Sequence, residues 1–142
     1  MSVTVRMLCA GEEDALTRAA SGVFDYPVRA DLAREFLADP RHHIAVAMDS
    51  GIVVGFASAV HYIHPDKPAE LWINEVGVAP SYRRQGFAKK ILEVLLDRGR
   101  TLGCHVAWVL TDTDNAAARA LYGSAGGEEL SQNTVHLEFK LS

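Results

Sequence analysis

The sequence of 142 residues has few cysteines and no excess of positive charge, and both shortages limit what the protein can be. Its two cysteines, Cys9 and Cys104, stand far apart and in no metal-ligand spacing, so we interpret them as reduced thiols. Lys and Arg number 14 against 18 Asp and Glu, a formal net charge of −4. This balance argues against a general nucleic-acid binder, because phosphate contacts need a cationic surface, and it suits a cationic small-molecule partner.

Long apolar runs are also missing. No stretch approaches the length of a membrane span, and the first residues lack the layout of a signal peptide, so we expect a cytoplasmic protein with no membrane partner. No linker, repeat or low-complexity segment interrupts the chain, which predicts a single domain over residues 1–142. Hydrophobic residues make up 49% and charged residues 23%, as in an ordinary folded domain.

Alternating and helical periodicities predict an α/β (α+β) fold, a sandwich in which helices cover a sheet. We expect strands at residues 4–8, 44–48, 52–62, 70–78, 105–110 and 135–141. We expect helices at residues 11–24, 31–38, 86–100 and 115–124. Strict alternation along the strand at 70–78 would place Glu75 on the same face as Ile73 and opposite to Trp72.

The turn between strand 70–78 and helix 86–100 carries two arginines and a glycine, the chemistry of an anion site. The first turn of a helix leaves backbone N–H groups free and carries the positive end of the helix dipole, so a pyrophosphate is a natural occupant. Gly86 permits close approach of the backbone, and Arg83 and Arg84 add charge-assisted contacts. The turn matches neither a dinucleotide-binding fingerprint nor a P-loop. The alternative is an ordinary helix start with surface arginines.

The pattern Arg83-x-x-Gly86-x-Ala88 after the strand Val76-Gly77-Val78 resembles the acyl-CoA-binding motif of the GNAT acetyltransferases, and the resemblance extends over most of the chain. It implies the GNAT fold, a mixed and mostly antiparallel central sheet that splays apart at the acetyl-CoA site, with acetyl-CoA as cosubstrate. The pyrophosphate would rest on the amides of the turn and the pantetheine arm along the preceding strand. The resemblance assigns these residues to acetyl-CoA: Val76, Gly77, Val78, Arg83, Arg84, Gln85, Gly86, Phe87, Ala88, Asn115, Ala118 and Tyr122.

Residues 114–122 resemble the second motif of this family, in which an Asn opens a helix and a Leu-Tyr pair follows. The resemblance implies that Asn115 contacts the pantetheine arm and that Tyr122 gives a proton to the departing thiolate. The alternative for Tyr122 is a half-buried helix tyrosine whose hydroxyl reaches water. After the helix, Gly126-Gly127 replaces the usual Gly-Phe.

Acetyl transfer to an amine also needs a base, and Glu75 is our candidate. An acid in the middle of a largely apolar strand is unusual, although a solvated strand charge is the alternative reading. Glu70 is the second candidate. By the same resemblance, the backbone N–H of Val76 would stabilise the oxyanion.

The segments 64–76 and 24–27 resemble the small aminoglycoside 3-N-acetyltransferases. This resemblance implies acetylation of the 3-amino group of these antibiotics, a resistance activity, in a pocket with several carboxylates. The expected substrate-binding residues are Asp25, Tyr26, His64, Asp66, Glu70, Glu75 and Asp112.

Three alternatives stay open: acetylation of another small amine, acetylation of a peptide or protein N-terminus, or a non-catalytic acyl-CoA-binding sensor. A homodimer is expected only from similarity. We predict no metal site, because His61 and His64 would point to opposite faces of an extended segment and chelate poorly.

Overall fold

The computed structural model describes residues 2–142, which form two compact units, one ending at Leu110 and one beginning at Thr111. The first unit contains β1 (Val3–Met7), α1 (Glu13–Thr17), α2 (Ala30–Ala38), β2 (His42–Asp49), β3 (Ile52–Tyr62), β4 (Glu70–Val78), the short 3-10 helix η1 (Pro80–Tyr82), α3 (Phe87–Thr101) and β5 (Val106–Trp108). The second unit contains α4 (Ala116–Ser124). No helix within residues 2–142 is both long and apolar enough to cross a membrane.

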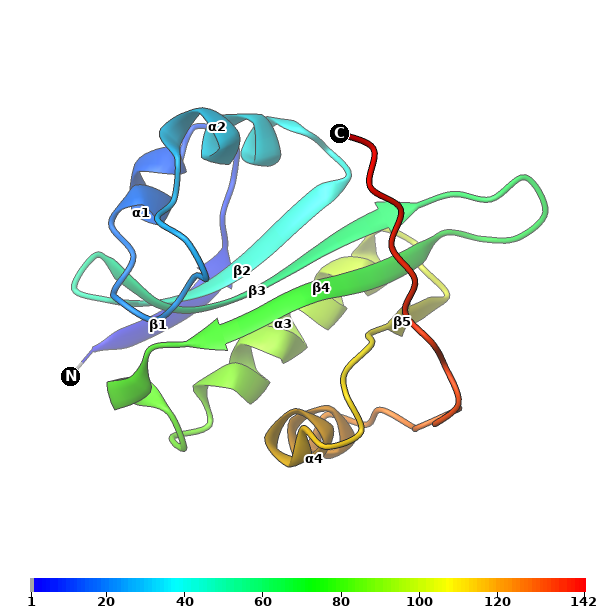
Figure 1. Cartoon of the computed structure of the whole chain (residues 1–142). Coiled ribbons are helices and arrows are strands. Elements are labelled where there is room, and N and C mark those ends of the chain that lie inside the picture. The colour runs from blue at the N-terminus through cyan, green and yellow to red at the C-terminus, as the bar shows by residue number, and fades with distance from the viewer. Residues whose placement is uncertain (1) are drawn as a thin grey trace. The chain divides into compact units, whose positions relative to one another are not determined.

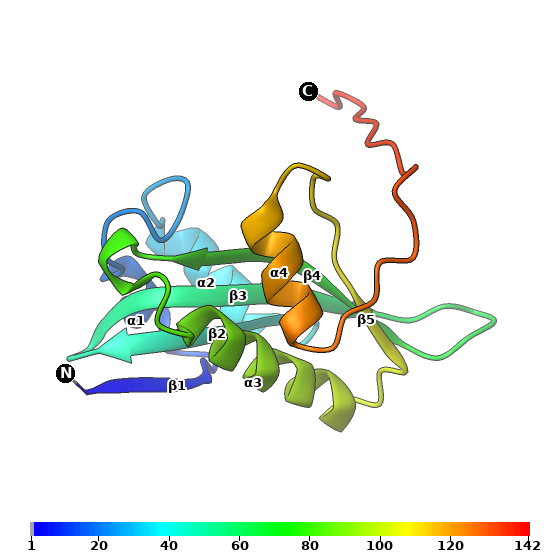
Figure 2. The ribbon, with the colours of Figure 1, turned by 90° about the horizontal axis from the view of Figure 1, so that it is seen from below.

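The strands form one sheet in the order β1-β2-β3-β4-β5, with antiparallel pairs up to β4 and a parallel pair between β4 and β5. Helices α1 and α2 cover one face and α3 covers the other (Figures 1 and 2). Leu71 of β4 and Ile91, Leu92 and Leu95 of α3 are almost completely buried. Their burial supplies much of the stability of this layer, and the predicted fold class is confirmed.

The hairpin between β2 and β3 forms where the sequence predicts it. Asp49 pairs with Ile52, and the two residues between them, Ser50 and Gly51, have φ angles of 53° and 82°. Two consecutive left-handed residues give a turn whose twist matches the twist of the flanking strands.

The helix predicted at residues 11–24 is wrong in length, because α1 ends at Thr17. The chain then pairs with the start of β3: the backbone N–H of Ala20 donates to the Val53 carbonyl at 2.9 Å. The segment that follows is held on the sheet by Phe24, whose ring stacks on Phe56 with centroids 4.2 Å apart. This pairing replaces the last turns of the expected helix with a loop that reaches the face of the sheet.

The strand predicted at residues 135–141 is also wrong, since residues 128–142 contain no helix or strand. Their alternating apolar side chains are exposed: Val135, Leu137, Phe139 and Leu141. Alternation identifies a face that could be buried, but it does not supply a partner for the strand backbone. The strand predicted at 105–110 is reduced to the three residues of β5.

Beneath α3, two histidines form a pH-sensitive contact. Nε2 of His43 lies 2.7 Å from Nδ1 of His61. Burial lowers the pKa of His43 from 6.5 to about 4, helped by the electrostatic influence of His61, Arg98 and His42, and Asp39 acts in the opposite direction. Between these two pH values the folded protein therefore binds fewer protons than the unfolded chain, so the free energy of unfolding falls as the pH falls.

We expect this loss to be present in the wild type and reduced in His43→Gln. Urea unfolding at pH 7 and pH 5 measures it, with His136→Gln as a control because that side chain is 79% exposed. The difference stays below about 3 kcal/mol, because one pKa unit corresponds to about 1.4 kcal/mol and the ring is only half-buried. An equal pH dependence in wild type and His43→Gln would contradict the assignment.

Candidate active site

A bulge in β4 decides which of its side chains share a face. Ser58 of β3 pairs with Glu75, but the next residue of β3 pairs with Ile73, so Asn74 is an extra residue in the strand. The extra residue turns Glu75 away from the buried Ile73 and toward the face of Ser58. The expectation that Glu75 lies opposite to Trp72 is therefore wrong, because strict alternation ends at the bulge.

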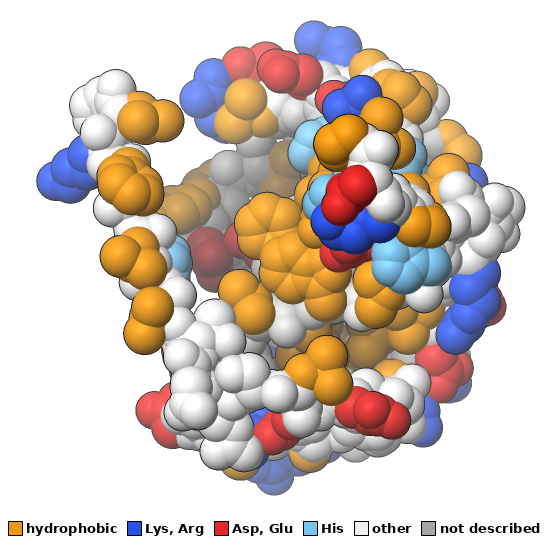
Figure 3. Space-filling view, turned by 90° about the vertical axis from the view of Figure 1, so that its right-hand side faces the viewer, with side chains coloured by type: hydrophobic (Ala, Val, Ile, Leu, Met, Phe, Trp, Pro, Cys, Tyr) orange, Lys and Arg blue, Asp and Glu red, His pale blue; other side chains and the backbone are white. Residues whose placement is uncertain are grey.

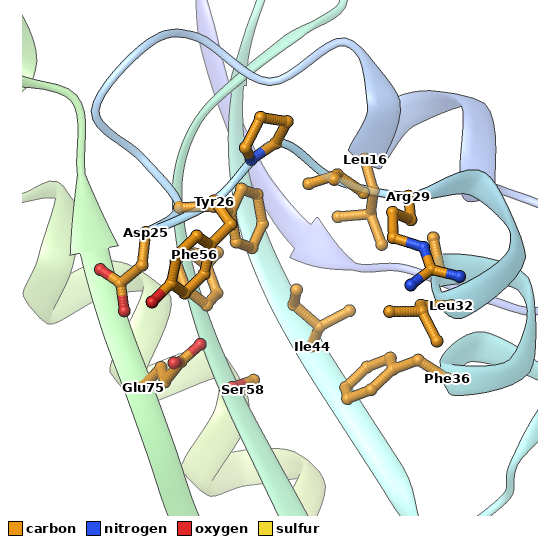
Figure 4. Close-up of a pocket in the computed structure, with 14 residues that line it drawn as sticks. Leu16, Asp25, Tyr26, Arg29, Leu32, Phe36, Ile44, Phe56, Ser58 and Glu75 are labelled. Atoms are coloured by element: carbon orange, nitrogen blue, oxygen red, sulfur yellow. The ribbon is translucent and has the colours of Figure 1, made fainter.

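Glu75 lines a cavity of about 540 Å³ between the sheet and the segments that carry α1 and α2. Asp25 and Tyr26, from the loop before α2, line the same cavity, and Figure 4 shows both near Glu75. The rest of the wall is largely apolar and includes Leu16, Leu32, Phe36, Ile44 and Phe56. Arg29 also lines the cavity, and its guanidinium pairs with Asp31 at 2.6 Å. A cavity with acids at one end and an apolar wall suits an amine-bearing molecule of modest size.

The Glu75 side chain is exposed, and no other side chain within residues 2–142 donates a hydrogen bond to its carboxylate. Its oxygens can therefore accept a proton or a hydrogen bond from a ligand. Ser58, directly across the strand pair, is only 8% exposed and adds a hydroxyl to the cavity wall. The sequence contained a signal for Ser58, a single polar residue within the apolar stretch of β3.

The remaining predicted substrate-binding residues belong to other segments of the chain. His64 and Glu70 form a pair, with Nε2 3.2 Å from Oε2, and Asp66 pairs with Lys67 at 3.3 Å in the loop between β3 and β4. Asp112 is an exposed residue of the second unit. His64, Asp66 and Glu70 do not line the cavity that contains Glu75.

One edge of β4 is open beside Glu75. β5 pairs with β4 only at Glu70, Leu71 and Trp72, and within residues 2–142 no strand pairs with that edge from Ile73 to Val78. The sheet therefore splays apart after Trp72. An unpaired strand edge offers backbone N–H and C=O groups to an extended ligand, and Val76, Gly77 and Val78 lie on it.

The turn that follows β4 is fixed by its own side chains. Nε of Arg83 donates to the Val78 carbonyl at 3.0 Å, and Nε2 of Gln85 donates to the Ser81 carbonyl at 3.1 Å. Two residues adopt left-handed backbone conformations, Arg84 at φ 62° and Gly86 at φ 82°. Arg83 and Gln85 thus hold the shape of the turn, and the Arg84 side chain is exposed beside it.

This turn presents a row of backbone donors. Within residues 2–142, the N–H groups from Arg84 to Ala88 donate to no protein acceptor. The N-cap of α3 is Gly86, and a glycine has no side chain to accept from them. A Cβ built on Gly86 would meet no protein atom within 4 Å, so the space beside it is open. Free N–H groups at the start of a fifteen-residue helix fit the diphosphate of coenzyme A.

In the second unit, Asn115 caps α4, and its Oδ1 accepts a hydrogen bond from the N–H of Ala118 at 3.0 Å. Its amide N–H groups are left for a ligand. Burial raises the pKa of Tyr122 on the same helix. The double glycine is explained by the end of α4: Gly127 N–H donates to the Tyr122 carbonyl at 2.9 Å, and a Cβ at Gly127 would come within 2.9 Å of that oxygen.

Comparison with known sequences agrees with this geometry. The model of the acetyltransferase (GNAT) family matches residues 12–126. Mycothiol acetyltransferase of Pseudarthrobacter chlorophenolicus is 31% identical over 135 residues, which is 87% of this chain and 42% of that protein. The [ribosomal protein bS18]-alanine N-acetyltransferase of Escherichia coli is 38% identical over 60 residues, 42% of this chain and 40% of that protein. The chain therefore spans less than half the length of these relatives.

Solved structures share the fold over the whole chain. An aminoglycoside acetyltransferase from an uncultured soil metagenomic sample has a TM-score of 0.81 at 26% identity, with 100% of both chains covered. AAC(6')-Iy in complex with the bisubstrate analogue CoA-S-monomethyl-acetylneamine has a TM-score of 0.79 at 20% identity, covering 99% of this chain and 100% of that one. The second likeness is evidence for the fold alone.

Proposed function

The chain belongs to the acetyltransferase (GNAT) family, and from this premise we propose that it transfers the acetyl group of acetyl-CoA to an amine of an aminoglycoside. The observation that carries the proposal is the position of Glu75. Its side chain lines the cavity that also contains Asp25, and it lies on β4, whose open edge runs toward the turn before α3 with its unpaired backbone N–H groups. The family match spans both units, which supports treating residues 1–142 as one acetyltransferase domain.

GNAT acetyltransferases use acetyl-CoA, and the residues present fit it. In our proposal the diphosphate binds the N–H groups from Arg84 to Ala88, with the Arg84 guanidinium as an additional charge. The pantetheine arm pairs with the backbone of Val76 and Val78 along the open edge of β4. Asn115 contacts the same arm through its amide N–H groups.

Each chemical requirement has a group in this proposal. Acetyl-CoA supplies the activated acetyl group. The Glu75 carboxylate accepts the proton of the acceptor ammonium, directly or through water, so that the amine nitrogen gains a free lone pair. The N–H of Val76 donates to the acyl oxygen as negative charge develops there. The Tyr122 hydroxyl donates its proton to the sulfur that leaves, and the second proton lost by the acetylated nitrogen restores the Tyr122 hydroxyl. The net result is one released proton, the one that Glu75 accepted and then passes to water.

The acceptor is argued from charge and shape. Asp25 and Glu75 place two carboxylates at one end of the cavity, and the chain carries a net charge of −4, which suits a molecule with several ammonium groups. Our specific proposal is the 3-amino group. The similar structure of AAC(6')-Iy makes the 6'-amine the competing position.

A peptide N-terminus is the second candidate acceptor, favoured by the local 38% identity to the bS18-alanine N-acetyltransferase. A peptide N-terminus offers a single ammonium group, whereas Asp25 and Glu75 bring two carboxylates to the cavity. A third candidate, a non-catalytic acyl-CoA sensor, has no need for an unpaired carboxylate in that cavity.

A thiol-release assay with acetyl-CoA tests the function. The panel contains aminoglycosides, polyamines, and peptides with N-terminal alanine. We expect turnover with aminoglycosides, and NMR of the product identifies the acetylated nitrogen. Turnover with the peptides alone would overturn the acceptor class, and acetylation at the 6'-nitrogen would overturn the 3-amino assignment. If coenzyme A binds but no amine in the panel is acetylated, we would conclude that the protein is a non-catalytic acyl-CoA sensor.

Tyr122→Phe tests the proposed acid. Because burial raises the pKa of Tyr122 above its ordinary value, the phenol keeps its proton throughout the neutral range. We expect kcat to fall about tenfold, with the dissociation constant for coenzyme A unchanged. This is less than the roughly 100-fold effect at the lower end for general acids, because a thiolate leaves readily. Steady-state kinetics and calorimetry measure the two effects. An unchanged kcat would remove Tyr122 from the mechanism.

A further inference from the structure

The chain's two tryptophans meet on the sheet face that carries Glu75. Trp72 of β4 and Trp108 of β5 are direct neighbours in the parallel pair, and their rings stack with centroids 5.1 Å apart and planes at 9°. Trp72 is 39% exposed. Figure 3, which views this end of the sheet, shows hydrophobic side chains gathered on the surface with histidine and acidic side chains beside them. Trp108 is partly exposed beside Trp72. A stacked pair of large aromatic rings that reaches the protein surface is unusual and points to ligand binding.

A hydrogen-bonded chain fixes the orientation of this pair. Trp108 Nε1–H donates to the Tyr62 hydroxyl at 2.9 Å, and that hydroxyl donates to Glu70 Oε1 at 3.3 Å. The second oxygen of Glu70 lies 3.2 Å from His64 Nε2, without the alignment of a hydrogen bond. The Glu70 and His64 side chains are only 15% and 23% exposed. Glu70 is thus a positioning residue, and the polar atom of Trp108 is already occupied, which leaves its ring surface for a ligand.

The bulge at Asn74 connects this cluster to the cavity. Val60 pairs with Trp72 and Ser58 pairs with Glu75, and residues two apart on β3 share a face, so Trp72 and Glu75 share a face as well. Their separation along β4 is at most about 10 Å, since a strand advances about 3.3 Å per residue. One molecule with two linked rings can therefore reach both.

We propose that the stacked indoles, exposed at Trp72 and partly exposed at Trp108, bind a second, amine-bearing ring of the acceptor while an amine of the first ring lies at Glu75. Aromatic surfaces attract the C–H faces of saturated rings, and Trp is the strongest aromatic partner for an ammonium group. The carboxylates of Glu70 and Glu75 on the same face favour a cationic occupant over a neutral one. This inference rests on the proposed function and adds that the acceptor has at least two rings.

The two tryptophans provide a binding assay that needs no catalysis, because all indole fluorescence of the protein comes from this cluster. Titration with the two-ring neamine should change the emission to saturation, whereas the single ring 2-deoxystreptamine should change it less. No change at saturating neamine would overturn the subsite. If no aminoglycoside is acetylated, the proposed function fails, and the titration still decides whether the aromatic site binds the two-ring amine.

Kinetics supply the second arm. For Trp72→Ala we expect the KM for neamine to rise about tenfold more than the KM for 2-deoxystreptamine, and for Trp72→Phe, which keeps an aromatic surface, to rise much less. Ile63→Ala, at a nearby side chain that is 73% exposed, is the control and should behave as wild type. Circular dichroism shows whether each variant folds. Equal effects of Trp72→Ala on both acceptors, with neamine acetylated normally by the wild type, would overturn the subsite and leave the proposed function standing.

Discussion

Glu75→Gln is expected to lower kcat by about 10²- to 10³-fold while the affinity for coenzyme A stays close to that of the wild type. The amide has nearly the size of the carboxylate and keeps a hydrogen-bond acceptor, so the cavity is preserved. It cannot take up the proton of an acceptor ammonium. The donor-rich turn from Arg84 to Ala88 lies beyond the end of β4, so a change at Glu75 leaves its N–H groups in place.

Steady-state kinetics with saturating acetyl-CoA, together with calorimetric titration of coenzyme A, measure the two quantities. Asp25→Asn is a matched variant, since it neutralises a second acid that lines the same cavity. We expect Asp25→Asn to act mainly on the KM for the acceptor, and Glu75→Gln to act on kcat. Normal turnover by Glu75→Gln would show that water or another group removes the proton. Equal loss of kcat in both variants would show that charge in the cavity, and not proton transfer, is what matters.

The features that the sequence predicted well depend on short-range signals. The turn at Ser50 and Gly51 follows from residues that tolerate left-handed conformations, and the start of α3 after Gly86 follows from a glycine before an amphipathic run. Strand β4 has the predicted bounds, and α2 begins one residue before the helix predicted at 31–38. Each of these signals lies within a few residues of the element that it specifies.

The errors come from contacts between distant parts of the chain. The bulge at Asn74 exists only in the pairing of β4 with β3, and it reverses the face that Glu75 occupies. The early end of α1 results from the hydrogen bond between Ala20 and Val53. A single sequence read by periodicity contains neither of these pairings, so no local pattern could have predicted them.

The candidate site divides in the same way. The turn between β4 and α3, where we propose that the diphosphate of acetyl-CoA binds, is a contiguous motif, so the sequence alone suggests its residues. The acceptor side draws on loops and strands far apart in the sequence, and Asp25, Tyr26 and Glu75 meet in a cavity whose apolar wall was not predicted. His64 and Glu70 were expected to bind substrate. The structure instead pairs them with each other and links Glu70 through Tyr62 to Trp108, an arrangement that needs the register of three strands.

Gly86→Val is expected to raise the KM for acetyl-CoA about 100-fold. The residue has a φ of 82°, a conformation that a β-branched side chain strongly disfavours, and its Cβ would enter the open space beside the unpaired N–H groups. If the turn rotates out of this conformation, some of its backbone N–H groups no longer point at the diphosphate. Each hydrogen bond to a charged group is worth about 1.5–3 kcal/mol, so losing one or two of them accounts for an effect of this size.

Gly103→Val is the matched control, because Gly103, just beyond the other end of α3, has the same φ of 82°, and a Cβ added there would also meet no protein atom within 4 Å. Both substitutions strain the backbone to a similar degree and lower the melting temperature, but only the one at Gly86 lies where we place the diphosphate. Calorimetric titration of coenzyme A and steady-state kinetics compare the two variants, and Gly86→Ala provides a milder change if Gly86→Val folds poorly. A similar KM for acetyl-CoA in the Gly86 and Gly103 variants would mean that the cosubstrate does not bind at the turn. The assignment of Glu75 as the base would then be wrong as well, because it assumes that the thioester lies beside Glu75.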